Sequence, residues 1–381
     1  MAKKIAILTQ PLHTNFGGTL QAFALQKTLI SLGYKVETLN YNWKQFSDLK
    51  KILSILKHKV LCNKSTFPFF GKELKAIEME HKKFIQKHIN YSKNLSSCHD
   101  LKHYIESQNF DAVIVGSDQV WRVAYSPRIE SFFLDFLVEK DNIKKIAYSA
   151  SFGIDEWQFN EIKSLEIKNL VKKFNAISVR EKSAVNLCKQ YLNIEVQHTL
   201  DPTFLLEQQE YLKLLNLEEK RIKNLGNIFV YVLDKNEIKE KIIKSISEKL
   251  GKKIFYNQPE KNTKEAYFIS DLEPYIYPPI ESWIKSFFDA DFIITDSFHG
   301  TVFSIIFNKP FISIVNKERG ASRFESILSQ LNLNHRMVNN ISEISSELLF
   351  DEIDYRIVNN KLADLKYESI DFLKKALAYD I

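Results

Sequence analysis

Short runs of consecutive apolar residues recur along this chain, and most of them stop at small or charged residues. The clearest are Lys4–Thr9, Asp111–Val115, Lys145–Ser149, Ala176–Val179, Asn227–Val232, Lys253–Tyr256, Asp291–Thr295 and Phe311–Val315. An apolar run of this length without alternation is typical of a strand that is buried on both faces, as in a parallel sheet. The pattern predicts an α/β protein in which polar loops follow the strands.

The N-terminus predicts a βαβ unit. The strand Lys4–Thr9 is followed by a loop from Gln10 to Gly18, then by apolar residues at helical spacing up to Gly33. The alternating segment Lys35–Tyr41 is the next predicted strand. Strand, glycine loop, helix and strand in this order open a doubly wound domain.

Two series of strands predict two domains, because 381 residues exceed an ordinary single core. We expect an N-terminal α/β domain over 1–206, with a lysine-rich helical insertion at 44–100. A second α/β domain is expected over 222–345, and a helical tail over 346–381 that packs back on the first domain. The predicted fold class is thus two Rossmann-like domains with a cleft between them.

Composition restricts the classes of function. No segment reaches the roughly 18 apolar residues of a membrane span, and the N-terminal apolar run is too short for a signal peptide, so we expect a cytoplasmic protein. Cys62, Cys98 and Cys188 lack metal spacing, so we expect reduced thiols and no metal site. The net charge of +6 is compatible with plain solubility or with attraction to anions. No nucleic-acid module is present.

The segment Thr295-Asp-Ser-Phe-His-Gly-Thr301 carries the sharpest chemical signal. It lies between a predicted strand and a short apolar helix expected over Val302–Phe307, where backbone N–H groups form an anion site. Ser297 and Thr301 are suited to capping that helix, and His299 stands where a ligand would lie. A lone histidine is more often structural, but this position favours a role in binding or catalysis.

Several ordered segments resemble the polysaccharide pyruvyl transferases. They are Asn15-Phe-Gly-Gly18 with Gln21, Gly116-Ser-Asp-Gln-Val-Trp121, Ser151-Phe-Gly153, Val179-Arg-Glu181, Asp201-Pro-Thr203, Trp283, Asp296-Ser-Phe-His-Gly300 and Pro310-Phe311. Each segment is weak alone, and their order along the chain makes the match specific. The segment 44–100 and the tail after 345 carry no matching motif.

The resemblance implies a fold similar to the two-domain B-type glycosyltransferases and an active site in the cleft. It also implies phosphoenolpyruvate as donor, a sugar with two hydroxyls as acceptor, a pyruvate ketal as product and no further cofactor. In that reading His299 is the general acid, because a histidine titrates in the required range. Asp118 accepts a proton from the sugar, or merely caps a helix, and Asp296 orients the turn that carries His299.

The donor carries a carboxylate and a phosphate, so cations and small residues are expected around it. Arg180, Arg319 and Arg323 could hold these two anionic groups, and Ser297, Gly300 and Thr301 in the His299 turn are the other expected donor-binding residues. Arginine holds carboxylates and phosphates through paired donors, although each arginine could equally form a surface ion pair. The acceptor is assigned to Asn15, Gly17, Gly18, Gln21 and Ser117, and the glycines could equally serve only a tight turn.

Some alternatives stay open at this stage. A glycosyltransferase of the same fold would use a nucleotide sugar and a ribose-binding carboxylate such as Glu273 or Glu281. A sugar-binding protein without chemistry is the other alternative. Asp201 could have a functional role or could equally mark a turn between the domains, and Trp121 and Trp283 are expected in the core rather than as sugar platforms. Whether the acceptor is free, nucleotide-linked or lipid-linked at the membrane surface stays open, as does the oligomeric state.

Overall fold

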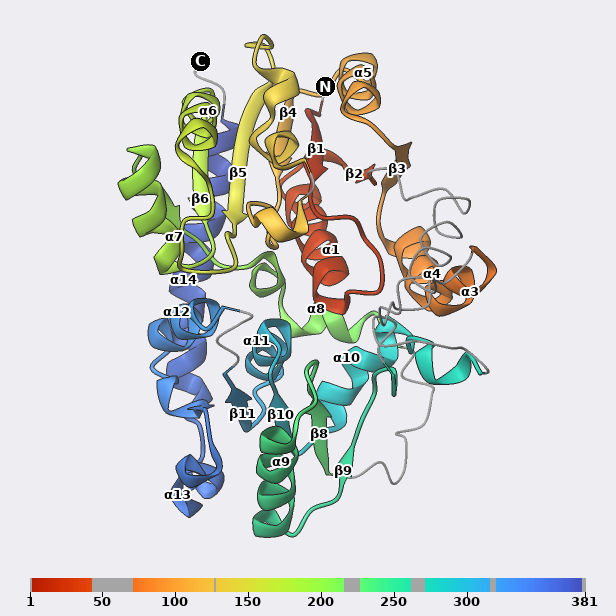
Figure 1. The fold of residues 1–381 in the computed structure, drawn as a ribbon, viewed down its shortest axis with the longest axis vertical. Helices are drawn as coiled ribbons and strands as arrows, with labels where there is room; N and C mark the ends of the chain where they lie inside the picture. Colours follow the sequence, from red (N-terminus) through yellow and green to blue (C-terminus); the bar gives the residue numbers. More distant parts are fainter. Residues whose placement is uncertain are drawn as a thin grey trace, which may run out of the picture.

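The computed structural model describes residues 2–42, 71–126, 128–215, 227–261, 271–315 and 320–378. Arg319 and residues 44–70 of the lysine-rich segment, which include Cys62, lie outside the described residues. Figure 1 shows two layered halves, each built around its own sheet.

All strand pairs of both sheets are parallel. The first sheet has seven strands in the order β3-β2-β1-β4-β5-β6-β7, and the second has five in the order β12-β11-β10-β8-β9. The strands of the first are β1 Lys4–Leu8, β2 Lys35–Tyr41, β3 Tyr91–Leu95, β4 Ala112–Val115, β5 Lys144–Ala150, β6 Ala176–Val179 and β7 Gln197–His198. Those of the second are β8 Ile228–Tyr231, β9 Ile254–Phe255, β10 Phe292–Thr295, β11 Phe311–Ile314 and β12 Met337–Val338.

Each sheet has one point at which the strand order reverses. In the first sheet this point lies between β1 and β4, and in the second between β8 and β10. In open parallel sheets, ligands bind beyond the carboxyl ends of the strands that flank such a point. The topology therefore predicts that ligand-binding residues follow the ends of β1, β4, β8 and β10, which are Leu8, Val115, Tyr231 and Thr295.

Helices cover both faces of each sheet. They are α1 Phe16–Ser31, α3 Gly71–Ile77, α4 Met79–His88, α5 Cys98–Ser107, α6 Glu161–Val171, α7 Lys182–Leu187, α8 Gln208–Leu212, α9 Glu237–Leu250, α10 Ile280–Asp289, α11 Phe298–Ile306, α12 Ser322–Gln330, α13 Ser346–Phe350 and α14 Tyr355–Leu377. Helices α1 and α14 share one apolar cluster with the first sheet, and α5, α6 and α7 share the cluster on its other face. The last helix therefore returns to the first sheet, as the blue ribbon in Figure 1 shows.

One apolar cluster joins the two halves. It contains residues of α10, α11 and α12 from the second half together with Phe16, Phe23 and Phe84 from the first. The ring of Phe16 stacks on Trp283 with centroids 5.1 Å apart. Trp121 and Trp283 are both fully buried, which confirms the prediction that they belong to the core.

The prediction of a helical insertion at 44–100 is wrong for part of its length. Within the described residues, α3 and α4 are helical, but Tyr91–Leu95 forms β3 at the edge of the first sheet. This strand reads YSKNL and buries only Ser92 and Leu95, so it lacks the apolar run of an interior strand. Its place depends on tertiary pairing with β2 rather than on local pattern.

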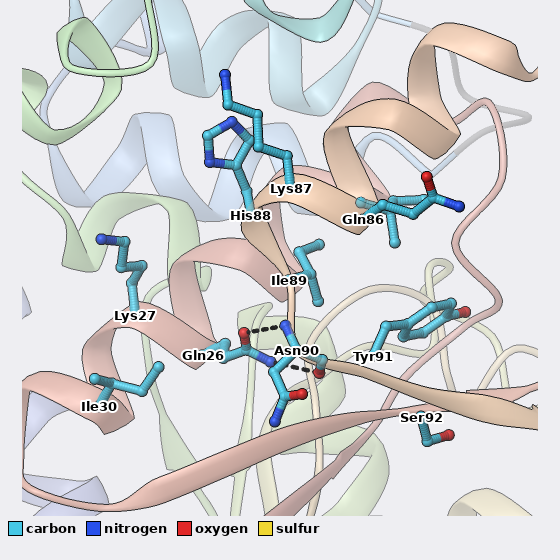
Figure 2. A pocket seen from close by; sticks show the side chains of 11 residues that line it. Gln26, Lys27, Ile30, Gln86, Lys87, His88, Ile89, Asn90, Tyr91 and Ser92 are labelled. Carbon is cyan, nitrogen blue, oxygen red and sulfur yellow. Dashed lines mark hydrogen bonds between the residues drawn. The ribbon is translucent and has the colours of Figure 1, made fainter.

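A pair of hydrogen bonds fastens the start of β3 to α1. The Gln26 amide donates to the Asn90 carbonyl and accepts from the Asn90 N–H, at 3.0 and 2.8 Å (Figure 2). The surrounding pocket of about 800 Å³ also contains Lys27, Lys87 and His88. None of its lining residues is among the residues predicted to bind the donor or the acceptor.

Candidate active site

His299 lies in the first turn of α11, directly after the end of β10. The predicted helix at 302–307 in fact begins at Phe298, because Ser297 caps it by accepting a hydrogen bond from Gly300 N–H at 3.4 Å. Gly300 permits a close approach, since a Cβ there would lie 2.1 Å from Oγ1 of Thr295. The imidazole is thus held at a helix N-terminus beside the reversal point of the second sheet.

Gly17, near the start of α1, packs against the His299 ring. A Cβ built at position 17 would lie 2.0 Å from Nδ1 and 2.2 Å from Cγ of His299. The helix N-terminus of the first half therefore meets the helix N-terminus of the second half at this ring. The structure brings together two residues that are 282 positions apart and that the sequence placed on opposite sides of the cleft.

Asp201 is the centre of the polar contacts around His299. Its Oδ2 accepts from Arg180 Nη1 at 2.9 Å and from Ser117 Oγ at 3.0 Å, and lies 3.6 Å from Nε2 of His299. Its Oδ1 accepts from the N–H and hydroxyl of Thr203 at 3.0 and 2.7 Å. This carboxylate is fully buried, so these contacts replace the water that it loses.

The charge of Asp201 is stabilised by its neighbours. Burial alone raises the pKa of a carboxyl group, but the His299 imidazole and the Arg180 guanidinium outweigh it and hold the pKa of Asp201 well below its ordinary value. Burial likewise lowers the pKa of Arg180, while Asp201, Glu181 and Asp118 raise it above its ordinary value. Both groups are therefore charged at neutral pH.

Two guanidinium groups meet at the ring of Phe298. The Arg180 Cζ lies 4.7 Å from the ring centroid, and the Arg323 Cζ lies 5.8 Å from it. Burial, and then the like charge of Arg180, lower the pKa of Arg323 to about 10. Two buried cations in this proximity repel each other and create a site that favours an anion.

Arg180 retains donors that no neighbour uses. Its side chain is 1% exposed, and within the described residues neither Nε nor Nη2 has a hydrogen-bond partner. Oε2 of Glu181 lies 3.9 Å from Nε, which is beyond hydrogen-bond distance. A guanidinium presents its donors as a planar fork, so two unsatisfied donors in one buried place suit a carboxylate or phosphate.

Asp118 stands at the end of β4, beside α1. Its backbone φ is 75°, a strained value for a residue other than glycine, and its Oδ1 accepts from the N–H of Gln119. A Cβ at Gly18 would lie 3.2 Å from Oδ2 of Asp118. Gly17 and Gly18 thus place His299 and Asp118 next to consecutive residues of one helix.

A pocket of about 500 Å³ opens beside Asp118. Asn15 and Asp118 both line it, together with the aromatic residues Tyr41, Tyr125 and Phe132. Asn15 also caps α1, because its side chain accepts from the N–H of Gly18 at 3.1 Å. Asn15 is also two residues before Gly17, which packs on the His299 ring, so the pocket adjoins the segment that contacts His299.

Three predicted site residues use their side chains in hydrogen bonds within the fold. Gln21 is buried and donates to Thr9 Oγ1 and to the Gly18 carbonyl. Thr301 is fully buried, and its hydroxyl bonds to Ser313. The Asp296 carboxylate accepts from the N–H groups of Leu233 and Asp234 and from Lys239 Nζ, at 2.7, 3.1 and 2.5 Å. These contacts support a structural role for all three side chains, with Asp296 joining the loops after β8 and β10.

Asp201 was not among the candidate site residues, although its segment carried part of the resemblance. It follows the two-residue strand β7, which has no apolar run to mark it. The usable signal was the Asp-Pro-Thr segment itself, because Thr203 fixes the carboxylate in a local turn. Only tertiary contacts with Arg180, Ser117 and His299 reveal its position.

No group of three or more His, Cys, Asp and Glu side chains within the described residues is arranged to hold a metal ion. None of the helices in the described ranges combines the length and the apolar character of a membrane span.

The family model described as polysaccharide pyruvyl transferase matches residues 15–318. No match was found among curated proteins.

Solved structures resemble the chain over nearly its whole length. UDP-N-acetylglucosamine 2-epimerase from Rickettsia bellii has a TM-score of 0.52 at 10% identity, with 99% of both chains covered. Arabidopsis thaliana UGT89C1, complexed with UDP-L-rhamnose, has a TM-score of 0.53 at 12% identity, with 98% of both chains covered. The N-terminal domain of Candida albicans trehalose-6-phosphate phosphatase has a TM-score of 0.53 at 10% identity, covering 100% of this chain and 98% of that one. These likenesses confirm the predicted two-domain B-type glycosyltransferase fold, and at such identity they show the fold alone.

Proposed function

The chain belongs to the polysaccharide pyruvyl transferase family, an enzyme family that transfers pyruvate onto polysaccharide, and we propose that its donor is phosphoenolpyruvate. In this proposal the acceptor is a sugar of a cell-surface polysaccharide or of its precursor. Two of its hydroxyls take up the pyruvate as a ketal, and phosphate is released. The reaction needs no cofactor beyond the donor.

The observation that carries the proposal is the pair of buried guanidiniums beside His299. Phosphoenolpyruvate has two anionic groups on one small carbon frame. Arg180 and Arg323 supply two cations at the ring of Phe298, and Arg180 has two buried donors without partners among the described residues. We assign the carboxylate to Arg180 and the phosphate to Arg323, with the N-terminus of α11 adding backbone N–H groups.

His299 is assigned as the general acid. The ionised Asp201 lies 3.6 Å from Nε2 and acts as a counter-ion for the protonated imidazole. The proton passes from His299 to the methylene carbon of the donor, which becomes a methyl group. Positive character then develops on the neighbouring carbon, next to a carboxylate that Arg180 holds in place.

The acceptor completes the ketal in two steps. The first sugar hydroxyl forms a C–O bond at the cationic carbon and gives up its proton, for which Asp118 is the assigned acceptor. The bond to the phosphate oxygen then breaks, the second hydroxyl attacks the same carbon, and its proton leaves with the phosphate. The pocket of about 500 Å³ that Asn15 and Asp118 line is the proposed place of the reacting sugar.

Donor entry requires a movement of the halves. The side chains of Arg180 and His299 are 1% and 9% exposed, so the described arrangement closes over them. Contacts across the closure include Lys182 N–H with Ser326 Oγ at 2.9 Å, besides the packing of Gly17 on His299. We propose that these contacts separate to admit the donor and re-form to exclude water.

The test compares ligands by thermal shift and calorimetry. Phosphoenolpyruvate should raise the melting temperature, a panel of nucleotide sugars should not, and Arg180→Ala should lose the shift. Arg356→Ala is the control, because this side chain is 91% exposed on α14. Stabilisation by a nucleotide sugar alone would instead favour glycosyl transfer, and glycan binding without phosphate release would favour an inactive sugar-binding protein.

A further inference from the structure

A third pocket, of about 840 Å³, lies at the carboxyl edge of the second sheet. It is formed by the residues that follow β9 and by the segment before α10, with Glu80 of α4 contributed by the first half. Residues of both halves therefore line it. Neither the donor nor the reacting sugar has been assigned to it.

This pocket is close to the His299 cluster through two short chains of contacts. The Tyr277 ring, which lines the pocket, lies 5.9 Å from the Phe16 ring, and Phe16 precedes the glycine that packs on His299. On the other side, Gln258 donates to the Val232 carbonyl at 2.8 Å. The residue after Val232 donates to Asp296, three positions before His299. These contacts connect the pocket to the His299 cluster from two sides.

The lining combines aromatic faces with hydrogen-bonding groups. Tyr256 is 48% exposed, and Oε1 of Gln258 is buried without a hydrogen-bond partner in the described part of the chain. Carboxylates and amide oxygens accept hydrogen bonds from hydroxyl groups, while aromatic rings pack against the apolar face of a sugar ring. Such a combination is typical of a site for a carbohydrate.

The charge of the lining disfavours an anionic ligand. Four carboxylate side chains line it, and no lysine or arginine does so within the described residues. The carboxylates are Glu80, Glu260, Asp271 and Glu273. Lys83 pairs with Glu80 at 2.7 Å, and Lys235 lies over the ring of Tyr256 at 5.9 Å, so cations reach only its border. A diphosphate placed here would face like charge, whereas a neutral sugar would not.

We infer that this pocket is a subsite for an uncharged sugar unit of an oligosaccharide acceptor, one or more units away from the sugar that reacts. The inference rests on the proposed function, since it concerns the acceptor of that reaction. It implies that the enzyme acts on a glycan of several units rather than on a single sugar. The residues that recognise this unit are Tyr256, Gln258 and Glu273.

The experiment measures binding of an array of neutral oligosaccharides of two to six units to the full-length protein. Wild type should retain a subset of longer glycans, and Tyr256→Ala and Glu273→Gln should each weaken that binding at least tenfold. Tyr367→Ala is the matched control, because this tyrosine is 73% exposed on α14. UDP and inorganic phosphate serve as competitors.

Three outcomes would each overturn the inference. Tyr256→Ala could bind glycans as well as wild type, wild type could bind no glycan, or UDP could displace the glycan. The rise in melting temperature with phosphoenolpyruvate is measured on the same variants. This second measurement distinguishes a failure of the subsite inference from a failure of the proposed function. A wild type that binds glycans through Tyr256 but is not stabilised by phosphoenolpyruvate would contradict the donor assignment while leaving the subsite in place. If Tyr256→Ala lost both glycan binding and the phosphoenolpyruvate shift, the variant would be misfolded. Glycan binding by Glu273→Gln would then test the subsite.

Discussion

Gly17 lies against the imidazole of His299 so closely that a Cβ at position 17 would come within 2.0 Å of Nδ1. Real Cβ contacts are essentially never shorter than 3.0 Å, so one of the two groups must move if Gly17 is replaced. The glycine is therefore required by a side chain of the other half of the molecule. Its freedom to adopt unusual backbone angles is not involved, since it lies within α1.

This relationship predicts a non-additive pair of substitutions. Gly17→Ala should destabilise the protein by about 1–3 kcal/mol, the usual cost of overpacking a buried contact. In the His299→Ala background the imidazole is gone, so the same substitution should cost little. Urea unfolding of the four proteins measures the coupling. Equal costs of Gly17→Ala in both backgrounds would contradict the contact.

His299→Ala alone should separate binding from turnover. We expect turnover to fall by about 10²-fold or more, the usual scale of general acid catalysis, while phosphoenolpyruvate still raises the melting temperature. Phosphate release with the acceptor glycan present measures the first quantity. Arg180→Ala is the contrasting variant, because it should lose the donor-induced shift itself. Normal turnover by His299→Ala would disprove the assigned role.

Asp201→Asn should damage both stability and turnover. The substitution removes the charge that pairs with Arg180 at 2.9 Å in a fully buried place. Leaving a buried guanidinium without its counter-ion costs about 3–5 kcal/mol. Ser117→Ala is the matched control, since it removes only a neutral donor to the same oxygen and should cost about 1 kcal/mol. If urea unfolding gave similar losses of unfolding free energy for the two variants, the ion pair of Asp201 with Arg180 would not be what stabilises this site.

The interior strands were predictable because each is an apolar run. Segments such as 112–115 and 292–295 are buried at every position, so local sequence is enough to mark them. The edge strands β3, β7 and β12 were not predicted. Gln197–His198 and Met337–Val338 have two residues each, and pairing with a neighbour is all that defines them.

The site was predictable to the extent that its residues follow such strands. Arg180 comes directly after β6 and Ser117 two residues after β4, and both side chains donate hydrogen bonds to Asp201. The direction of a side chain was not predictable in the same way. Asp296 and His299 share one turn, yet the carboxylate turns toward Lys239 and the imidazole toward Gly17. Contacts between distant segments decide such directions, and no local pattern carries them.

His81 predicts a dependence of stability on pH. Its side chain is fully buried between Phe16 and Tyr277, and burial lowers its pKa to about 3. Below pH 6.5 the unfolded chain binds a proton at His81 that the folded chain does not bind. The free energy of unfolding therefore falls as pH decreases from about 6.5 toward 3, by at most about 1.4 kcal/mol per pH unit.

The measurement is urea unfolding at pH 7 and pH 5 for wild type and His81→Leu. Leucine has no proton to bind and no buried nitrogen without a partner. Between pH 7 and pH 5, the free energy of unfolding of the variant should therefore fall by about 1–2 kcal/mol less than that of wild type. His103→Leu, on the exposed face of α5, is the control and should leave the pH dependence as it is. An unchanged slope in His81→Leu would show that this histidine is protonated in the folded state.

Arg323→Met should weaken donor binding. Burial, and then the like charge of Arg180, lower the pKa of Arg323 to about 10, and an anion placed beside the two cations relieves their repulsion. Phosphoenolpyruvate should therefore raise the melting temperature of wild type, and it should raise that of the variant by much less, because the phosphate has lost its cation. Each protein is compared with its own ligand-free form, so the measured shift does not depend on how stable the variant is by itself. Arg356→Met, exposed on α14, should keep the full shift. An equal shift in wild type and Arg323→Met would contradict the assignment of the phosphate to Arg323.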